Sequence, residues 1–248
     1  MATTMRGRRI PISYARRIII DLMRFSMNVP LVSVTRHMNI GRLLQRRTAR
    51  DERPMWVSIF TRAYGLVSEE FPEFRRVYVK LPWPHLCEYS TSIGMVVIER
   101  DYLGEPGVFM VRVQNFAKNS VASIDRVLND AKTAPIKQVR EFRRMFIIAR
   151  LPLPIRRTIW WLGLNIGRLR ARYFGTFAIT SLSALGVATH TLLTPGPAIL
   201  TFSPIAEDGS VIITLHWDHR VMDGVVIARA LARLEDILNG PIADELAN

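Results

Sequence analysis

The sequence predicts a single domain of the α/β (α+β) class, with a mixed central sheet and helices packed on it. The first observation is that segments with strand-like alternation are separated by segments with helical periodicity, so helices cross between strands. The second is size, because 248 residues with 49% hydrophobic content can bury a sizeable core. The third is that the sequence contains no G-x-G-x-x-G or Walker pattern, which disfavours nucleotide-phosphate chemistry.

The helices follow from periodic apolar residues and from signals at their ends. One apolar pattern ends just before Pro72, because proline cannot continue a helix. Ser120 stands just before another pattern, where a serine can cap the start of a helix. The expected helices cover residues 10–27, 41–52, 55–71, 120–133 and about 225–238.

The strands follow from β-branched and aromatic residues that alternate with polar ones or form short apolar runs. The turn-like segment "RDYLGEPG" separates two of them and predicts a hairpin. The expected strands cover residues 29–40, 92–99, 107–116, 174–182, 197–205 and 210–217. The uncharged window from Tyr173 to Ala206 is rich in Gly, Pro, Ser and Thr, so we expect strands there and no membrane-spanning helix.

The chain is strongly basic, and its single cysteine indicates a reducing compartment. The net charge is +13, and of 34 basic residues 30 are arginine. Arginine favours phosphate and carboxylate partners, although a genome rich in arginine codons would give the same bias. One cysteine, Cys87, can form neither an internal disulfide nor a multi-cysteine zinc site, and no secretory signal is visible. We therefore expect a cytoplasmic protein without a metal.

Residues 135–172 stand apart from the rest of the chain. They hold ten basic residues and one acidic residue, Glu141, and they interleave aromatic side chains with aliphatic ones. The two prolines of "LPLP" predict two short helices. This pattern suits an element that lies on an anionic membrane surface, which would place the protein peripherally on the inner face of the membrane, or an arm that packs on a neighbouring subunit. Nucleic acid is disfavoured, since no RNA- or DNA-binding signature appears.

The stretch "HWDHRVMDG", residues 216–224, holds two of the five histidines at a strand-to-helix connection. His219 and Asp223 lie four residues apart, and an Asp-Gly pair suits a tight turn with the aspartate as helix cap. A histidine at a strand end titrates near neutral pH and can take a proton from a thiol or hydroxyl. The structural alternative is a capped helix beside a buried, hydrogen-bonded histidine.

The same stretch resembles the HxxxDG signature of the catalytic domain of dihydrolipoyl acyltransferases, the core component of 2-oxoacid dehydrogenase complexes. Chloramphenicol acetyltransferase shares that fold and signature. Other segments resemble the family in the same order, among them "AYGLVSEEFPEF", "GTFAITSLSALGV" and "PGPAILTFSPI". The resemblance covers roughly residues 10–240 and departs from the family at 135–172. It implies one chloramphenicol acetyltransferase-like lobe spanning residues 1–248, with an insertion at about 135–172.

The resemblance implies roles for individual residues. His219 matches the catalytic general base, Asp223 matches the aspartate that holds the geometry of the site, and Thr180 stands where the family has a serine that donates to the oxyanion. Asp218 matches a structural aspartate. Trp217 is expected to wall the pocket, and His216 to have no part in the chemistry.

The resemblance also implies the cofactor and partners. The similarity begins near residue 10 and leaves no lipoyl or subunit-binding domain, so no covalent lipoyl group is expected. The acyl donor is expected to be acyl-CoA or an acyl carrier protein, and the arginine-rich surface would suit the phosphates of coenzyme A. The alternative functions are a non-catalytic scaffold and a peripheral membrane-binding module with a vestigial site.

A homotrimer is expected, with active sites between subunits. Two-lobed relatives of this fold are about twice as long and place the histidine between their lobes, so a single lobe needs a neighbour for the second wall. Thr180 of one chain would then face His219 of the next. The tail "NGPIADELAN" has few large apolar groups, so assembly is expected to stop at three chains.

Overall fold

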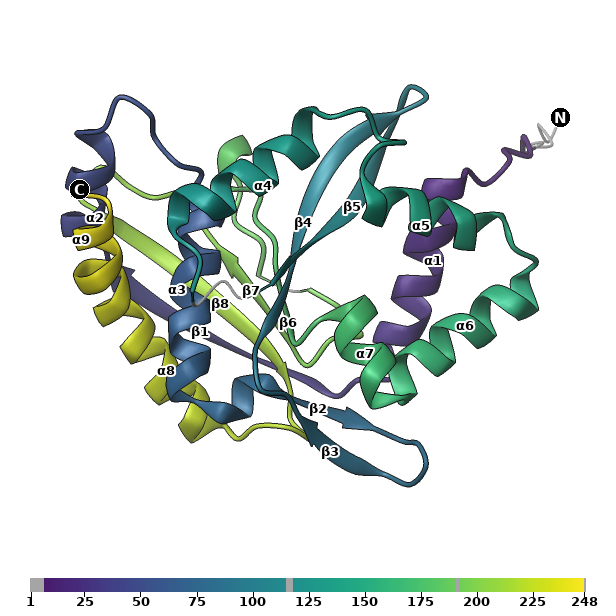
Figure 1. The fold of residues 1–248 in the computed structure, drawn as a ribbon. Helices are drawn as coiled ribbons and strands as arrows, with labels where there is room; N and C mark the ends of the chain where they lie inside the picture. Colours follow the sequence, from purple (N-terminus) through teal and green to yellow (C-terminus); the bar gives the residue numbers. More distant parts are fainter. Residues whose placement is uncertain (1–6, 115–117, 191, 248) are drawn as a thin grey trace, which may run out of the picture.

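A computed structural model describes residues 7–114, 118–190 and 192–247, and it confirms the expected fold class. Figure 1 shows a twisted sheet with helices packed on it. The helices are α1 (Tyr14–Ser26), α2 (Gly41–Thr48), α3 (Trp56–Glu70), α4 (Val121–Thr133), α5 (Arg140–Arg150), α6 (Leu153–Asn165), α7 (Gly167–Phe174), α8 (Gly224–Ile237) and α9 (Ala243–Glu245). The strands are β1 (Leu31–Asn39), β2 (Arg76–Val79), β3 (His85–Glu88), β4 (Ile93–Tyr102), β5 (Glu105–Gln114), β6 (Phe177–Ile179), β7 (Ala198–Phe202) and β8 (Ser210–Asp218).

Six strands form the main sheet in the order β1-β8-β7-β6-β4-β5, and β2 and β3 form a separate hairpin. The sheet is mixed, because β6 is parallel to both β4 and β7 whereas β8 is antiparallel to β7 and to β1. Strands that run in opposite directions end at opposite edges of the sheet. The ends of β6 and β8, which carry the predicted site residues, are therefore at opposite edges.

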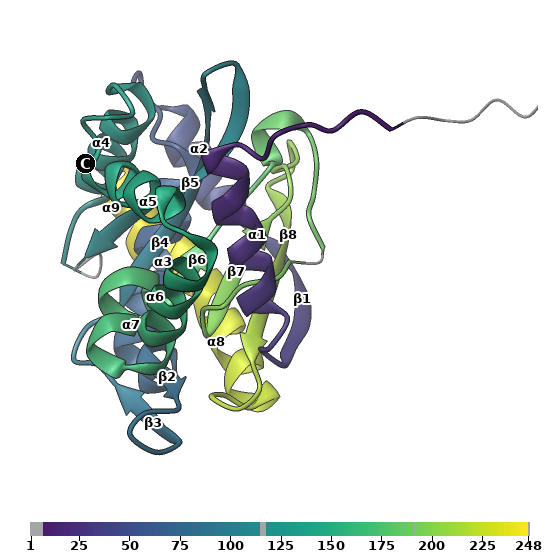
Figure 2. The same ribbon diagram turned by 90° about the vertical axis from the view of Figure 1, so that its right-hand side faces the viewer.

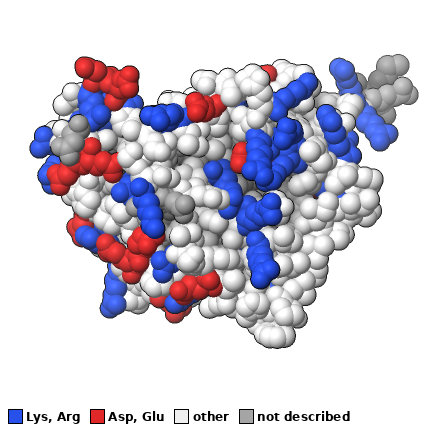
Figure 3. Space-filling model, in the orientation of Figure 1, with Lys and Arg blue, Asp and Glu red and all other residues white. Residues whose placement is uncertain are grey.

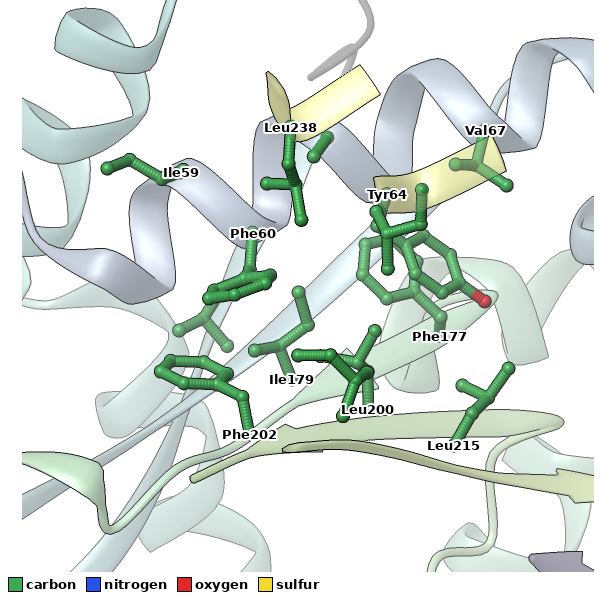
Figure 4. Packing of buried hydrophobic residues seen from close by; sticks show 14 of the residues in the cluster. Ile59, Phe60, Tyr64, Val67, Phe177, Ile179, Leu200, Phe202, Leu215 and Leu238 are labelled. Atoms are coloured by element: carbon green, nitrogen blue, oxygen red, sulfur yellow. The ribbon is translucent and has the colours of Figure 1, made fainter. Parts of the chain in front are cut away.

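One face of the sheet is covered by α3, α4 and α8, and the main hydrophobic core lies between them. Figure 4 shows aromatic rings of α3 stacked on side chains from the strands. The ring of Phe60 lies 4.3 Å from that of Phe202, and the ring of Tyr64 lies 3.8 Å from that of Phe177. Side chains alternate along a strand, so the neighbours of Phe177 and Phe202 on their strands point to the opposite face of the sheet, which we call the second face.

The insertion at 135–172 folds onto its own chain. Helices α5 and α6 pack on α1, as Figures 1 and 2 show, and the ring of Trp160 stacks on Phe25 at 5.8 Å. Arg156 of α6 forms an ion pair with Asp21 of α1, and both side chains are buried. Three of the four aromatic residues of this segment, Phe142, Phe146 and Trp160, are buried in the protein core, whereas the fourth, Trp161, is exposed.

Most expected elements are present, and the differences have local causes. The hairpin β2–β3 was not expected, because its strands have four residues each and surround a proline-rich turn. The basic helix α7 was also not expected. The end of the strand expected at 107–116 lies outside the described residues. No helix in the described ranges is long and apolar enough to cross a membrane.

Candidate active site

His219 lies directly after Asp218, the last residue of β8. Its backbone N–H donates to the carbonyl of Pro30 at 3.2 Å, which fixes the chain position next to the start of β1. Its side chain is 48% exposed. The buried-histidine alternative is therefore wrong for His219, whose imidazole is accessible to a ligand.

Asp223 lies beside this imidazole without holding it tightly. The distance from His219 Nδ1 to Asp223 Oδ1 is 3.7 Å, which is too long for a hydrogen bond. Asp223 occupies the N-cap position of α8 as expected, but its side chain accepts no capping hydrogen bond, and it is 85% exposed. The expected side-chain cap is thus wrong, and the carboxylate stays available beside the histidine.

Asp218 is buried at the end of β8 and is surrounded by arginine. Its two oxygens accept from Arg220 Nε at 2.8 Å and from a terminal nitrogen of Arg220 at 2.7 Å. The guanidinium of Arg220 also lies 4.4 Å from the ring centre of Tyr78, on β2. This ion pair and the stacked ring fix the backbone on both sides of His219.

Arg170 of α7 brings a second positive charge toward the same carboxylate. It is buried and donates to the carbonyls of Leu164 and Pro195 at 2.8 and 2.9 Å. Burial lowers the pKa of Arg170 to about 10, and the charge of Asp218 acts in the opposite direction. The inserted helix α7 is therefore connected electrostatically to the strand end that presents His219.

Trp217, expected to wall the pocket, is buried in the main core with its ring centre 6.0 Å from that of His219. Strand alternation directs its ring into the main core, and its Nε1–H donates to the carbonyl of Met222 at 3.0 Å. This hydrogen bond spans the turn that contains His219. Trp217 thus stabilises the turn from the core side of the sheet.

His216 lies on the second face of the sheet and is buried. Its Nδ1 is 2.5 Å from the hydroxyl of Ser33 on β1, and its buried Nε2 has no partner within the described residues. Burial lowers the pKa of His216, because desolvation disfavours the charged ring. The buried-histidine description therefore fits His216, three residues before the exposed histidine.

Thr180 follows β6 and faces the second side of the sheet. Phe177 and Ile179 point into the main core, so Ala178 and Thr180 point the other way. Within the described part of the chain, the Thr180 hydroxyl has no hydrogen-bond partner. The neighbouring hydroxyl of Ser181 instead donates to the carbonyl of Phe202 at 2.9 Å. Of these two hydroxyls, only that of Thr180 is free for a ligand.

Thr180 and His219 of one chain do not meet. Sheet register places Thr180 beside Thr201 on β7, and Thr201 pairs with Thr214 on β8. His219 is five residues beyond Thr214, one residue past the end of β8. With about 3.3 Å per residue along a strand and about 4.8 Å between strands, the two residues are separated by about 19 Å. A reaction that uses both residues at one centre therefore needs Thr180 and His219 from different chains.

Other candidate sites in the described ranges do not involve these residues. An open pocket of about 610 Å³ is lined by Arg50, Ser120, Asp125, Glu245 and others around α2, α4 and α9. None of the predicted site residues lines this pocket. Among the described residues, no group of three His, Cys, Asp or Glu side chains is placed to hold a metal ion.

No protein-family profile and no curated protein matches the sequence. Two solved structures each cover 96% of this chain and 93% of their own, at a TM-score of 0.69 and 18% identity. One is the cubic core of the pyruvate dehydrogenase multienzyme complex, and the other is the dihydrolipoamide acetyltransferase of Azotobacter vinelandii. The chain has the dihydrolipoamide acetyltransferase fold.

Chloramphenicol acetyltransferase shares this acetyltransferase fold, at a TM-score of 0.52 and 15% identity, covering 90% of this chain and 94% of the other. The expected resemblance is thus confirmed as a likeness of fold. Sequence reasoning identified the strand ends of the acetyltransferase fold but missed Arg170, Arg220 and Tyr78. Arg220 alone had a local signal, because it lies two residues from Asp218.

Proposed function

We propose that the protein is an acyltransferase that moves an acyl group from acyl-CoA, or from a carrier-bound thioester, to a hydroxyl, thiol or amine acceptor. The observation that supports this most strongly is the placement of His219. It is an exposed imidazole at a strand end, flanked by the ion pair of the buried Asp218 with Arg220 and supported by a core tryptophan, on a fold shared with two acetyltransferases. An imidazole that a ligand can reach can act as a general base.

In the proposed reaction, His219 takes the proton from the acceptor while the acceptor attacks the thioester carbonyl. The carbonyl oxygen becomes an oxyanion in the tetrahedral intermediate, and the Thr180 hydroxyl of a neighbouring chain donates a hydrogen bond to it. The intermediate collapses, the carbon–sulfur bond breaks, and the protonated His219 returns a proton to the leaving thiolate. The products are the acylated acceptor and the free thiol of coenzyme A or the carrier.

The comparison with the Azotobacter vinelandii enzyme supports these assignments. A serine, a histidine and an asparagine were investigated there for their role in the catalytic mechanism, and the histidine and asparagine are four positions apart. Here His219 and Asp223 have the same spacing, and Thr180 supplies the hydroxyl. This chain has an aspartate in place of the asparagine, and its carboxylate lies 3.7 Å from His219.

Self-association follows from the same proposal, because one chain holds Thr180 and His219 at opposite edges of its sheet. In a ring of three chains, each interface would combine Thr180 of one chain with His219 of its neighbour. The solved cubic core is likewise an assembly of chains with this fold. Mass photometry of the purified protein tests this part: a species of three times 28.4 kDa is expected, and an active monomer would contradict it.

The transfer activity is tested by following thiol release from a panel of acyl-CoAs with added alcohols, thiols and amines. Calorimetry with coenzyme A measures binding separately. Wild type should bind coenzyme A and release thiol, whereas His219→Ala should retain binding and its melting temperature but lose about 10²–10⁴-fold in turnover. Binding without any turnover in wild type would favour the scaffold function, and turnover of His219→Ala equal to wild type would exclude the assigned base.

A further inference from the structure

The outer face of α6 is apolar where a surface helix usually carries polar residues. Ile155 is 52% exposed, Ile159 39% and Trp161 42%, whereas Trp160 and Arg156 on the opposite side are buried against α1. In a soluble amphipathic helix the apolar stripe faces the core and the other face is polar. On the outer side of α6, Ile155 and Ile159 lie on one flank and Trp161 on the other, and no described part of the chain covers these three side chains.

The hairpin β2–β3 extends this apolar surface. The backbone N–H of Leu81, at the hairpin, donates to the carbonyl of Asn165 at the end of α6, at 3.1 Å. Trp83 in the hairpin turn is 68% exposed. Figure 1 shows α6 and the hairpin together on the lower right of the molecule. We call the exposed side chains of Ile155, Ile159, Trp161 and Trp83 the α6–hairpin surface.

Positive charge surrounds the α6–hairpin surface. The sequence from 142 to 206 contains eight arginines and no carboxylate side chain. Arg156 and Arg170 are buried, whereas Arg143, Arg150 and Arg168 are exposed. Figure 3 shows the basic side chains gathered over α5 and α7, beside a wide uncharged area over α6. An exposed apolar surface thus borders an excess of unneutralised arginine.

We propose that the α6–hairpin surface docks the protein on an anionic lipid bilayer. Aliphatic and tryptophan side chains enter the boundary between headgroups and acyl chains, while arginines at the rim attract anionic headgroups. Nucleic acid would leave the aliphatic side chains unused, and two copies of this surface face to face would oppose like charges. The inference rests on exposed residues and charge, and it is independent of the transfer reaction.

The test is co-sedimentation of the full chain with vesicles of phosphatidylcholine alone and of an equimolar mixture with phosphatidylglycerol. Binding should be stronger to the anionic vesicles and should weaken as salt is added. The double variant Ile159→Ser/Trp161→Ser should bind more weakly by tenfold or more, on the order expected from two lost apolar groups. Arg143→Gln/Arg168→Gln should lose about fivefold per arginine.

Matched controls are Val127→Ser on α4 and Arg46→Gln on α2, which are exposed on other helices and should bind as wild type. Trp161→Phe keeps the apolar character and should sediment normally, but it should lose part of the fluorescence quenching by brominated phosphatidylcholine. This variant keeps the test valid if the double variant unfolds. Equal binding to neutral and anionic vesicles would overturn the proposal. So would an Ile159→Ser/Trp161→Ser protein that binds vesicles normally but no longer assembles, because the surface would then be a subunit contact.

Discussion

Both oxygens of the buried Asp218 carboxylate accept hydrogen bonds from the guanidinium of Arg220, at 2.8 and 2.7 Å. The two residues flank His219, so the ion pair closes a loop of three residues around the proposed base. Arg170 adds a buried positive charge from α7. Fixing a residue through its neighbours leaves the imidazole itself free for substrate, which a direct contact to the ring would not.

Asp218→Asn should therefore damage both stability and turnover. The change leaves the part-buried guanidinium of Arg220 and the buried one of Arg170 without the negative charge of the carboxylate, and leaving buried groups unpaired in this way costs about 1–3 kcal/mol. Denaturant unfolding measures this loss. Glu207→Gln, an exposed change in the turn before β8, should leave the free energy of unfolding unchanged. An Asp218→Asn protein as stable as wild type would show that the ion pair does not anchor the strand end.

Thr180→Val should lower kcat and leave KM nearly unchanged. The hydroxyl is lost at nearly constant volume, and an oxyanion donor acts mainly in the transition state, so a loss of about 10²–10³-fold in kcat is expected. Ser181→Ala is the matched control, because that hydroxyl is already bound to the carbonyl of Phe202. Steady-state kinetics of both variants distinguishes the two hydroxyls. An effect of Thr180→Val confined to KM would contradict the oxyanion role.

His216 should make the protein less stable in acid. Burial lowers its pKa in the folded state, so the unfolded chain binds the proton more readily. The contribution of neutral His216 is therefore complete above the unfolded value of about 6.5 and is lost as the pH falls below it. His216→Asn can still bond Ser33 but does not titrate. Between pH about 7.5 and about 5.5, its melting temperature should fall less than that of wild type. If the melting temperatures of wild type and His216→Asn fell equally, groups other than His216 would account for the sensitivity to acid.

Local sequence signals predicted most elements of this fold. The strand β8, the start of α8 and the Ser120 cap of α4 follow from alternation, an Asp-Gly turn and a serine before an apolar helix. Alternation along β8 also places Trp217 in the core and His216 on the second face. Leu215 predicts this, because an apolar residue two positions before Trp217 shares its face of the strand.

Long-range features could not be predicted in the same way. The order of strands and the opposite directions of β6 and β8 depend on pairings between distant segments, so the separation of Thr180 from His219 carries no local signal. The stacking of Arg220 on Tyr78 likewise depends on a hairpin of two four-residue strands, whose patterns are too short to recognise. The ion pair of Asp21 with Arg156 joins segments 135 residues apart.

The central claim is that one active site combines Thr180 of one chain with His219 of another, and mixing two inactive variants tests it most directly. Thr180→Val and His219→Ala chains are co-expressed in equal amounts with different tags, and mixed oligomers are isolated and assayed. In a mixed trimer, one of the three interfaces combines an intact Thr180 with an intact His219, so about a third of wild-type turnover is expected. If both residues acted within one chain, every chain would still carry one defect. Turnover of the mixed oligomers no higher than that of the separate variants would contradict the shared site.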